Sequence, residues 1–386
     1  MIFGKSLEEL EKIKAIFTAT EIRQQPELWR ETYRLILDQK ESIQRFINKN
    51  VDKNTRIVLT GAGTSDYVGD TVALELNKKL EAKVEAIATT DIVSNPNEYI
   101  EKNVKTILVS YARSGNSPES IGAYDLFENN VDDITQIVIT CNKDGDLAKR
   151  CVNNEKNMLV LMPEKSNDKS FAMTSSFSCM TLATLLIFDI ENIEKNKEFV
   201  EIVSSQAEEI LDNRWSEIKQ LVDYEAERVV YLGSGTLKGL CQEMALKNLE
   251  LTSGQVTTIC ESVLGFRHGP KSIINDKTLV IIMATNEEYT KLYDIDLIKE
   301  IHNDLGNHKL AVITYENDEI MKENCSNYIC VNGKTIPNIY KIFNYMIFGQ
   351  MFGYLSSLKL NISPDNPRPD GTVNRVVKGV VIHQYK

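Results

Sequence analysis

The chain has 386 residues, enough for two domains of ordinary size, and it is 42% hydrophobic and 26% charged, as globular proteins are. Its formal net charge of -11 at pH 7 argues against nucleic acid as a general partner, because an acidic surface repels phosphate backbones. For the same reason a phosphorylated ligand would need a local binding site.

No segment has the pattern of a signal peptide or of a membrane-spanning helix. The N-terminal residues lack a basic start followed by an apolar block, and no uncharged apolar run reaches about 18 residues. We therefore expect a cytoplasmic protein with no membrane partner. The cysteines are irregularly spaced and the histidines form no metal-binding motif, so we expect reduced thiols and no metal. No dinucleotide or P-loop motif is complete, so no cofactor is expected.

The first half of the chain predicts one α/β domain. Residues 1–52 have helical patterns, and Trp29, Ile36 and Ile43 recur at seven-residue spacing, which indicates a face that packs on the rest of the protein. Over residues 53–190, helical patterns alternate with five β-branched segments: 56–65, 83–88, 105–115, 135–140 and 157–163. This alternation predicts βαβ units and a parallel sheet.

The second half repeats this series over residues 228–360. Its five β-branched segments are 228–236, 255–260, 277–284, 309–314 and 327–331. Gly61 and Gly233 are 172 residues apart, as are Lys105 and Lys277. The constant offset predicts two copies of one domain, each a five-stranded parallel sheet flanked by helices, with a helical linker at 191–227. The last segment, 361–386, is rich in Pro and Asp at its start and is expected to be a tail that lies near a site.

Three loops of the first copy are rich in glycine and hydroxyl residues. Each follows a predicted strand, and ligands of open α/β sheets bind at the carboxyl ends of strands. Backbone N–H groups and hydroxyls suit a phosphate ester. The candidate binding residues are Gly63, Thr64, Ser65, Arg113, Ser114, Asn116, Ser117, Thr174 and Ser175. The alternative, that these residues only form turns and helix caps, stays open. The second copy keeps only GSGT at 233–236, so the two copies have diverged in role.

These loops resemble a known family. GAGTS after a strand, ARSGNSPES and ESVLGFRHGPKS (261–272) resemble sugar isomerase (SIS) domains. With ALKNLE (245–250) and the terminal NPRP and NRVVKGVVI, the chain is similar to the isomerase half of glucosamine-6-phosphate synthase. It is still more similar to the tagatose-6-phosphate ketose/aldose isomerase group, whose members are taken to be galactosamine-6-phosphate deaminases. The resemblance covers about residue 55 to the C-terminus and implies flavodoxin-like domains.

The resemblance also implies residue roles. Glu250 matches the carboxylate that moves a proton between C1 and C2, and His268 matches the histidine that opens the sugar ring across a dimer interface. Lys378 matches a C-terminal lysine that approaches the carbonyl, and Lys247 matches a lysine one turn before the glutamate. Thr64, Ser114, Ser117 and Thr174 match hydroxyls that hold phosphate. Glu261, at the end of a predicted strand, has a suitable position but no assigned role.

Each catalytic candidate has a structural alternative. Glu250 and Lys378 could be solvated charges, and His268 could begin a helix. The sequence also departs from the synthase: Arg113 stands where the synthase has Gln, Ala112 where it has Ser, and the loop before RHGP is two residues longer.

The expected activity is conversion of an aldosamine 6-phosphate, D-galactosamine 6-phosphate in the first place, to tagatose 6-phosphate and ammonia. No glutaminase segment matches, so free ammonia is the expected nitrogen product. Glucosamine-6-phosphate deamination, fructosamine-6-phosphate deglycation and a non-enzymatic sugar-phosphate sensor remain alternatives. The expected assembly is a homodimer or higher homo-oligomer with shared active sites, and nucleic acid is not an expected partner.

Overall fold

The computed structural model describes residues 1–377 and 379–385, and the chain forms two compact units, each considered by itself below. The first-sheet unit contains residues 27–168, 173–198 and the described part of 370–386. The second-sheet unit contains residues 1–26, 169–172 and 199–369.

The first-sheet unit contains five parallel strands in the order β2-β1-β3-β4-β5. They are β1 (Arg56–Thr60), β2 (Lys83–Ala86), β3 (Thr106–Ala112), β4 (Ile134–Thr140) and β5 (Met158–Leu161). Every residue of β1 and β3 is buried, as expected for central strands covered on both faces. The five predicted strands are confirmed.

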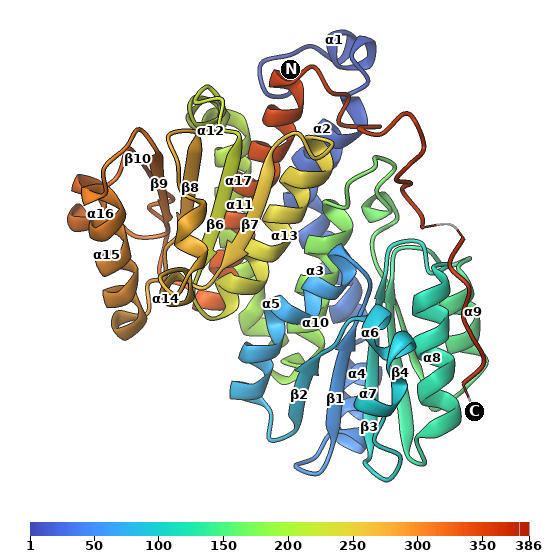
Figure 1. The fold of residues 1–386 in the computed structure, drawn as a ribbon. Helices are drawn as coiled ribbons and strands as arrows, with labels where there is room; N and C mark the ends of the chain where they lie inside the picture. Colours follow the sequence, from blue (N-terminus) through green and yellow to red (C-terminus); the bar gives the residue numbers. More distant parts are fainter. Residues whose placement is uncertain (378, 386) are drawn as a thin grey trace. The chain divides into compact units, whose positions relative to one another are not determined.

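Helices cover both faces of this sheet. On one side, α6 (Thr89–Ser94), α8 (Pro118–Asn130) and α9 (Asp146–Val152) contribute apolar side chains to the core over β1, β3 and β4. On the other side lie α5 (Thr64–Lys79) and α10 (Ser175–Ile187), and Figure 1 shows both helices opposite α8 and α9. Short helices α7 (Pro96–Tyr99), η1 (Glu164–Ser166) and η2 (Ile190–Asn192) complete the connections.

The predicted apolar face of the N-terminal helices is buried. Trp29 and Ile36 on α3 (Gln25–Asp38) and Ile43 on α4 (Lys40–Asn50) have almost no exposed surface. The indole Nε1 of Trp29 donates to Ser178 Oγ on α10 at 2.8 Å, so the large ring is both packed and hydrogen-bonded. The seven-residue spacing therefore predicted the packing face correctly.

The second sheet has the same strand order as the first, and its strands follow those of the first at the offset found in the sequence. Its strands are β6 (Arg228–Gly233), β7 (Thr257–Glu261), β8 (Thr278–Met283), β9 (Lys309–Thr314) and β10 (Asn327–Cys330). They lie in the order β7-β6-β8-β9-β10, all parallel. This is the flavodoxin-like order, in which strand order reverses between the first and third strands. The predicted duplication is confirmed at the level of topology.

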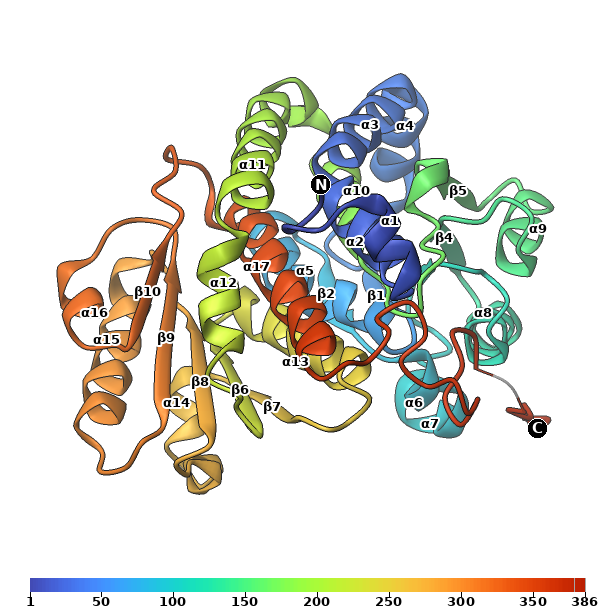
Figure 2. The same ribbon diagram turned by 90° about the horizontal axis from the view of Figure 1, so that it is seen from above.

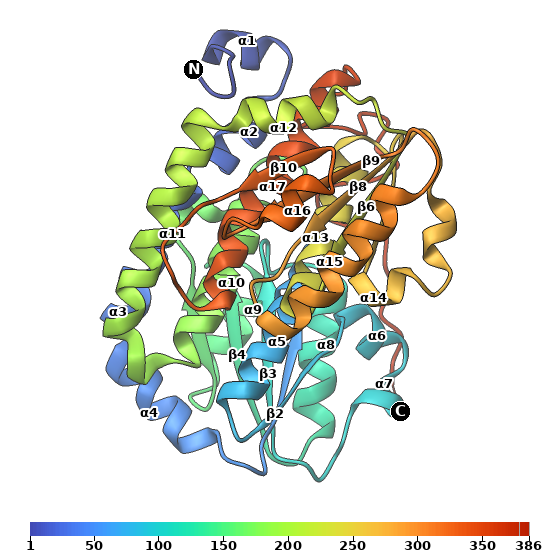
Figure 3. The same cartoon turned by 90° about the vertical axis from the view of Figure 1, so that its left-hand side faces the viewer.

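Two helical layers cover the second sheet. The helices α14 (Val263–Phe266), α15 (Glu288–Asn303) and α16 (Glu319–Glu323) share one core with β6, β8 and β9. Figures 2 and 3 show α15 and α16 together on that side. On the other side α13 (Thr236–Leu251) packs on β6, β7 and the almost fully buried α17 (Asn338–Lys359). The remaining elements are α1 (Leu7–Lys12), α2 (Ile16–Arg23), α11 (Ile193–Asn213), α12 (Trp215–Val222) and η3 (Pro270–Ile273).

Segments near both ends of the chain form hydrogen bonds within one unit. In the second-sheet unit, Asp365 accepts hydrogen bonds from the amides of Phe17 and Thr18 at 3.0 and 2.8 Å. In the first-sheet unit residues 379–385 run as an extended segment beside α8, where Tyr385 donates to Asn97 (Figure 1). Among the described residues no single helix is long and apolar enough to cross a membrane; one bent pair, Ser175–Ile187 with Ile190–Asn213, meets that criterion by length and composition only.

Candidate active site

The first loop of the first sheet is a tight turn that starts a helix. Gly63 has φ 56° and ψ -127° and directly precedes α5, so its conformation is one that residues with a Cβ rarely adopt. A Cβ on Gly61 would lie 2.4 Å from the backbone of Ser65, which leaves no room for a side chain. The turn therefore places Thr64 and Ser65 in the first turn of α5, where backbone amides and the helix dipole favour an anion.

The second loop lies beside the first because β1 and β3 are neighbours, with Thr60 opposite Ser110. The buried hydroxyl of Ser110 has no hydrogen-bond partner among the described residues. Ser114 Oγ accepts from the Asn116 amide at 3.3 Å, and Ser117 Oγ donates to Ser120 at 2.6 Å. The Ser114 hydroxyl is thus an acceptor in the fold and keeps its own proton for a ligand.

Arg113 is buried at this loop, with only 6% of its surface exposed. Its guanidinium donates to the carbonyl oxygen of Arg375 in the C-terminal tail at 2.7 Å. Arg375 in turn donates to the carbonyl oxygen of Asp168. The tail is therefore attached to the second loop by an arginine that was predicted to bind substrate. Lys378, the predicted catalytic residue of this tail, lies outside the described residues.

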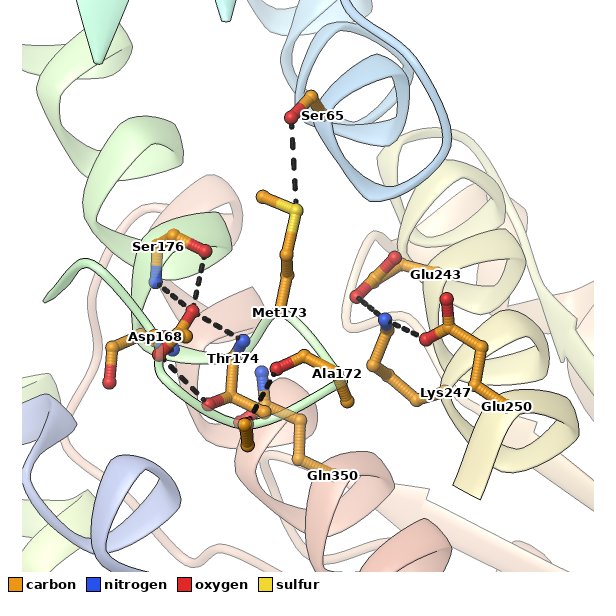
Figure 4. A network of polar contacts seen from close by, with 12 residues as sticks. Ser65, Asp168, Ala172, Met173, Thr174, Ser176, Glu243, Lys247, Glu250 and Gln350 are labelled. Atoms are coloured by element: carbon orange, nitrogen blue, oxygen red, sulfur yellow. Dashed lines mark hydrogen bonds and ion pairs between the residues drawn. The ribbon is translucent and has the colours of Figure 1, made fainter. Parts of the chain in front are cut away.

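The third loop is organised by a carboxylate that the sequence analysis missed. Asp168 is fully buried, and it accepts from the amides of Thr174, Ser175 and Ser176 at 2.9, 3.1 and 2.9 Å (Figure 4). These are the first amides of α10, so the aspartate neutralises the positive end of that helix. The nearby Met173 sulfur accepts from Ser65 Oγ at 3.9 Å, which brings the third loop to the first.

In the second-sheet unit, three charged residues share one face of α13. Lys247 Nζ forms an ion pair with Glu250, and it lies 3.7 Å from Glu243 Oε1 (Figure 4). The Lys247 and Glu243 side chains have no exposed surface, whereas that of Glu250 is 25% exposed. Glu250 is thus the one carboxylate of this cluster that a ligand can reach. Glu243 was missed, although its spacing of four residues from Lys247 predicts the same helix face.

Glu261 is a hydrogen-bonded carboxylate at the end of β7. It accepts from the Ser262 amide at 2.7 Å and pairs with Lys238 on α13 at 3.0 Å. The amide of Ser262, and then the Lys238 ammonium, hold the pKa of this carboxyl below its usual value. A carboxylate held in this way is better suited to positioning neighbouring groups than to transferring a proton.

His268 lies on the surface, in the turn that follows α14. Its amide donates to the Gly265 carbonyl at 3.0 Å, and Gly269 after it has φ 120°, which fixes the path of the turn. Its ring is exposed in the unit that contains it. Within the described part of the chain, no group of three or more His, Cys, Asp or Glu side chains could hold a metal ion.

The two halves of the chain both match one family model. The SIS domain model matches residues 51–189 and residues 224–354, which together make up more than half of the chain. The chain belongs to the SIS domain family. Each SIS domain contains one of the two sheets, and the first contains the three hydroxyl-rich loops.

Relatives match along almost the entire length. D-galactosamine-6-phosphate deaminase AgaS of Shewanella sp. (strain ANA-3) is 42% identical over 384 residues, which cover 98% of this chain and 95% of that protein. The crystal structure of a Clostridium novyi NT protein assigned as a tagatose-6-phosphate ketose/aldose isomerase is 46% identical, with a TM-score of 0.97 over 100% of this chain and 99% of that one. The tagatose-6-phosphate ketose/aldose isomerase of Escherichia coli is 32% identical, with a TM-score of 0.86 and coverage of 96% and 97%.

Proposed function

We propose that this protein is a D-galactosamine-6-phosphate deaminase, which converts its substrate and water to tagatose 6-phosphate and ammonia in amino-sugar catabolism. The observation that carries the proposal is the Glu250 carboxylate, partly open and paired with the buried Lys247, in a chain 42% identical over 384 residues to a protein of that name. A sugar-phosphate sensor would need the phosphate loops but not this helix face.

The proposed chemistry needs one base that takes a proton and returns it. In the open-chain substrate, Glu250 removes the proton from C2, and the electron pair of that C–H bond forms a C1–C2 double bond. The C1 carbonyl oxygen takes a proton from water and becomes a hydroxyl. Glu250 then returns the proton to C1, which leaves an imine at C2. Water adds to this imine and ammonia leaves, so the product is the ketose 6-phosphate. The ion pair with Lys247 holds the Glu250 carboxylate in a fixed position on α13, from which it can act as this base.

In this proposal the first SIS domain holds the phosphate group. The amides at the start of α5 and the hydroxyls of Thr64, Ser65, Ser114 and Ser117 are the donors, and Arg113 supplies positive charge near them. Because the chain has a net charge of -11, this local set of donors must supply the attraction that the whole molecule lacks.

His268 and Lys378 are proposed to open the sugar ring and to approach the carbonyl. An exposed histidine suits a residue that serves a neighbouring subunit, and histidine exchanges protons near neutral pH. The proposal therefore includes a homo-oligomer, at least a dimer. It also places the enzyme in the cytoplasm, because sugar phosphates do not cross membranes unaided.

A panel of hexosamine 6-phosphates tests the function. Ammonia release is measured with galactosamine, glucosamine and fructosamine 6-phosphates, and the ketose product is identified. We expect the highest kcat/KM with galactosamine 6-phosphate and tagatose 6-phosphate as the product. A preference for one of the other two sugars would replace the substrate but keep the class of reaction. Tight binding of a sugar phosphate without ammonia release would support a sensor and contradict the proposal.

A further inference from the structure

A buried carboxylate of an N-terminal helix holds the third loop, residues 168–176. Glu21 on α2 is only 4% exposed, and its Oε1 accepts from the amides of Lys169 and Ser170 at 2.5 and 3.2 Å. Its other oxygen, Oε2, accepts from the Ser170 hydroxyl. Because a carboxylate is costly to bury unless donors surround it, these two residues are held firmly against it.

Each part of the third loop is fixed within its own unit. Residues 169–172 belong to the second-sheet unit, as Glu21 does, whereas Asp168 and residues 173–198 belong to the first-sheet unit. In the first-sheet unit Asp168 accepts from the first amides of α10 (Figure 4). The loop therefore has two buried carboxylates as anchors, one for the segment before α10 and one for the start of α10 itself.

Glu21 has a defined position because α2 is held in the second-sheet unit at both of its ends and along its length. Asp365 accepts from the amides of Phe17 and Thr18 at the start of the helix, and from the Thr18 hydroxyl at 2.8 Å. The helix also packs on α17. The ammonium of Lys169 lies 5.9 Å from the centre of the Phe17 ring, which adds a cation–π contact between loop and helix.

The helix that provides this carboxylate lies outside the regions that the family model matches. The SIS domain model starts at residue 51, and α2 ends at Arg23. The sequence pattern of residues 1–52 predicts only packing on the rest of the protein. The contact with the third loop adds a second role, because this loop continues directly into Thr174 and Ser175, two of the candidate phosphate-binding residues.

We propose that Glu21 is a positioning residue for substrate binding. It fixes residues 169–172, so that the chain enters α10 with Thr174 and Ser175 ready to bind phosphate. Without the carboxylate the donors of this segment lose their acceptor, and the loop takes several conformations. Phosphate binding must then order the loop, which lowers affinity and leaves the proton transfer unchanged. The step from the loop to phosphate rests on the proposed function; the step from Glu21 to the loop does not.

Glu21→Ala and Glu21→Gln test the proposal in the full chain. In Glu21→Ala, the KM for galactosamine 6-phosphate and the Kd for inorganic phosphate should rise about tenfold, as expected for a loop that is competent about a tenth of the time. The kcat should stay nearly unchanged. Glu21→Gln keeps one acceptor oxygen and should have a smaller effect. Thr18→Val is the matched control on the same helix, because it removes a hydroxyl that donates to Asp365 and leaves the loop contacts in place. It should lower the thermal unfolding midpoint and leave both constants unchanged.

Hydrogen exchange separates the two steps of the proposal. Amides of residues 169–176 should exchange faster in Glu21→Ala than in the wild-type chain or in Thr18→Val. If Glu21→Ala does not fold, Ser170→Ala takes its place, since it removes the hydroxyl donor and keeps the carboxylate, and it should show the same changes at a smaller size. Unchanged exchange in this segment, or unchanged phosphate affinity despite faster exchange, would overturn the proposal. A wild-type chain that binds neither phosphate nor the sugar phosphate would count against the proposed function, and exchange would still decide the step from Glu21 to the loop.

Discussion

At the residue scale, the most informative residue is Glu250, whose carboxylate is partly open while its partner Lys247 is fully buried. Replacing Glu250 with Gln keeps the shape and removes the base. We expect turnover to fall by about 10²–10⁴-fold with substrate affinity nearly kept. Exchange of the C2 hydrogen with deuterated solvent should fall in parallel. Wild-type exchange in the Glu250→Gln variant would assign the proton transfer to another group, and Glu261 is the next carboxylate to examine.

The phosphate loops give a second prediction at this scale. Ser114→Ala and Thr64→Ala should chiefly weaken binding of the phosphorylated sugar, because each removes a hydrogen bond to a charged group. The expected loss is about 1.5–3 kcal/mol, or about tenfold to a hundredfold in affinity. Calorimetric titration of a substrate analogue measures it, and Ser94→Ala on the exposed side of α6 is a matched control expected to change nothing. Unchanged affinity in both loop variants would mean that the loops hold something else.

The pair formed by Glu243 and Lys247 predicts a stability effect. Both side chains are fully buried, so Lys247→Met leaves the Glu243 carboxylate without its cation, whereas Glu243→Gln leaves Lys247 its second partner, Glu250. Lys247→Met should lower the free energy of unfolding by about 3–5 kcal/mol, and Glu243→Gln should lower it by less. The double variant should lose clearly less than the sum, because it buries neither charge. Urea unfolding measures all three, and additive losses would contradict a direct pairing.

At the element scale, helix α5 contains a carboxyl, that of Asp66, whose ionisation lowers the stability of the folded chain. Burial, and then the negative charges of Asp70 and Asp91, raise the pKa of Asp66 from an ordinary value of 3.8 to about 7. The folded chain therefore binds this proton more tightly than the unfolded chain does. The resulting stabilisation is fully present below about pH 4 and is lost as pH rises through about 7.

Asp66→Asn tests this assignment. The free energy of unfolding should fall between pH 5 and pH 8 in the wild-type chain, and this fall should be smaller in the variant, which has no proton to lose at that position. Asp125→Asn on α8 is a control in which burial raises the pKa of the replaced carboxyl less. An unchanged pH dependence in Asp66→Asn would assign the titration to a different group; the next candidate is Asp294 on α15, because burial raises the pKa of its carboxyl to about 6.

Most of the helices and strands could be predicted from the sequence, because the signals that define them lie close together in the chain. All ten strands coincide with short segments rich in β-branched and other apolar residues. These segments recur at an offset of about 172 residues, so the strands predicted in one copy support those predicted in the other. The glycine turns before α5 and α13 were also visible, because a left-handed turn before a helix needs glycine. What the pattern did not predict was Asp168, since its hydrogen bonds to the start of α10 depend on how the loop folds back.

At the scale of the whole molecule, the proposed oligomer predicts complementation between two inactive variants. If His268 serves the neighbouring subunit, a mixed dimer of Glu250→Gln and His268→Ala chains contains one intact site and one doubly altered site. The purified mixed dimer is therefore expected to have about half of the wild-type activity. Co-expression and purification through two different tags measures it, with each variant alone as the control. Recovery that stays at the sum of the single variants would show that each chain supplies its own histidine.

The sequence by itself determined the duplicated α/β fold, the phosphate-loop candidates and the family, because strand periodicity, glycine turns and a constant offset are local or repeated signals. Only the tertiary structure shows which partners each charged side chain contacts. Glu243 was found by its burial beside Lys247, and Glu21 by its contacts with Lys169 and Ser170, which lie 148 and 149 residues away in the chain. A buried carboxylate looks in sequence like any surface charge. Its role depends on the donors that folding brings to it, and these come from other strands and helices.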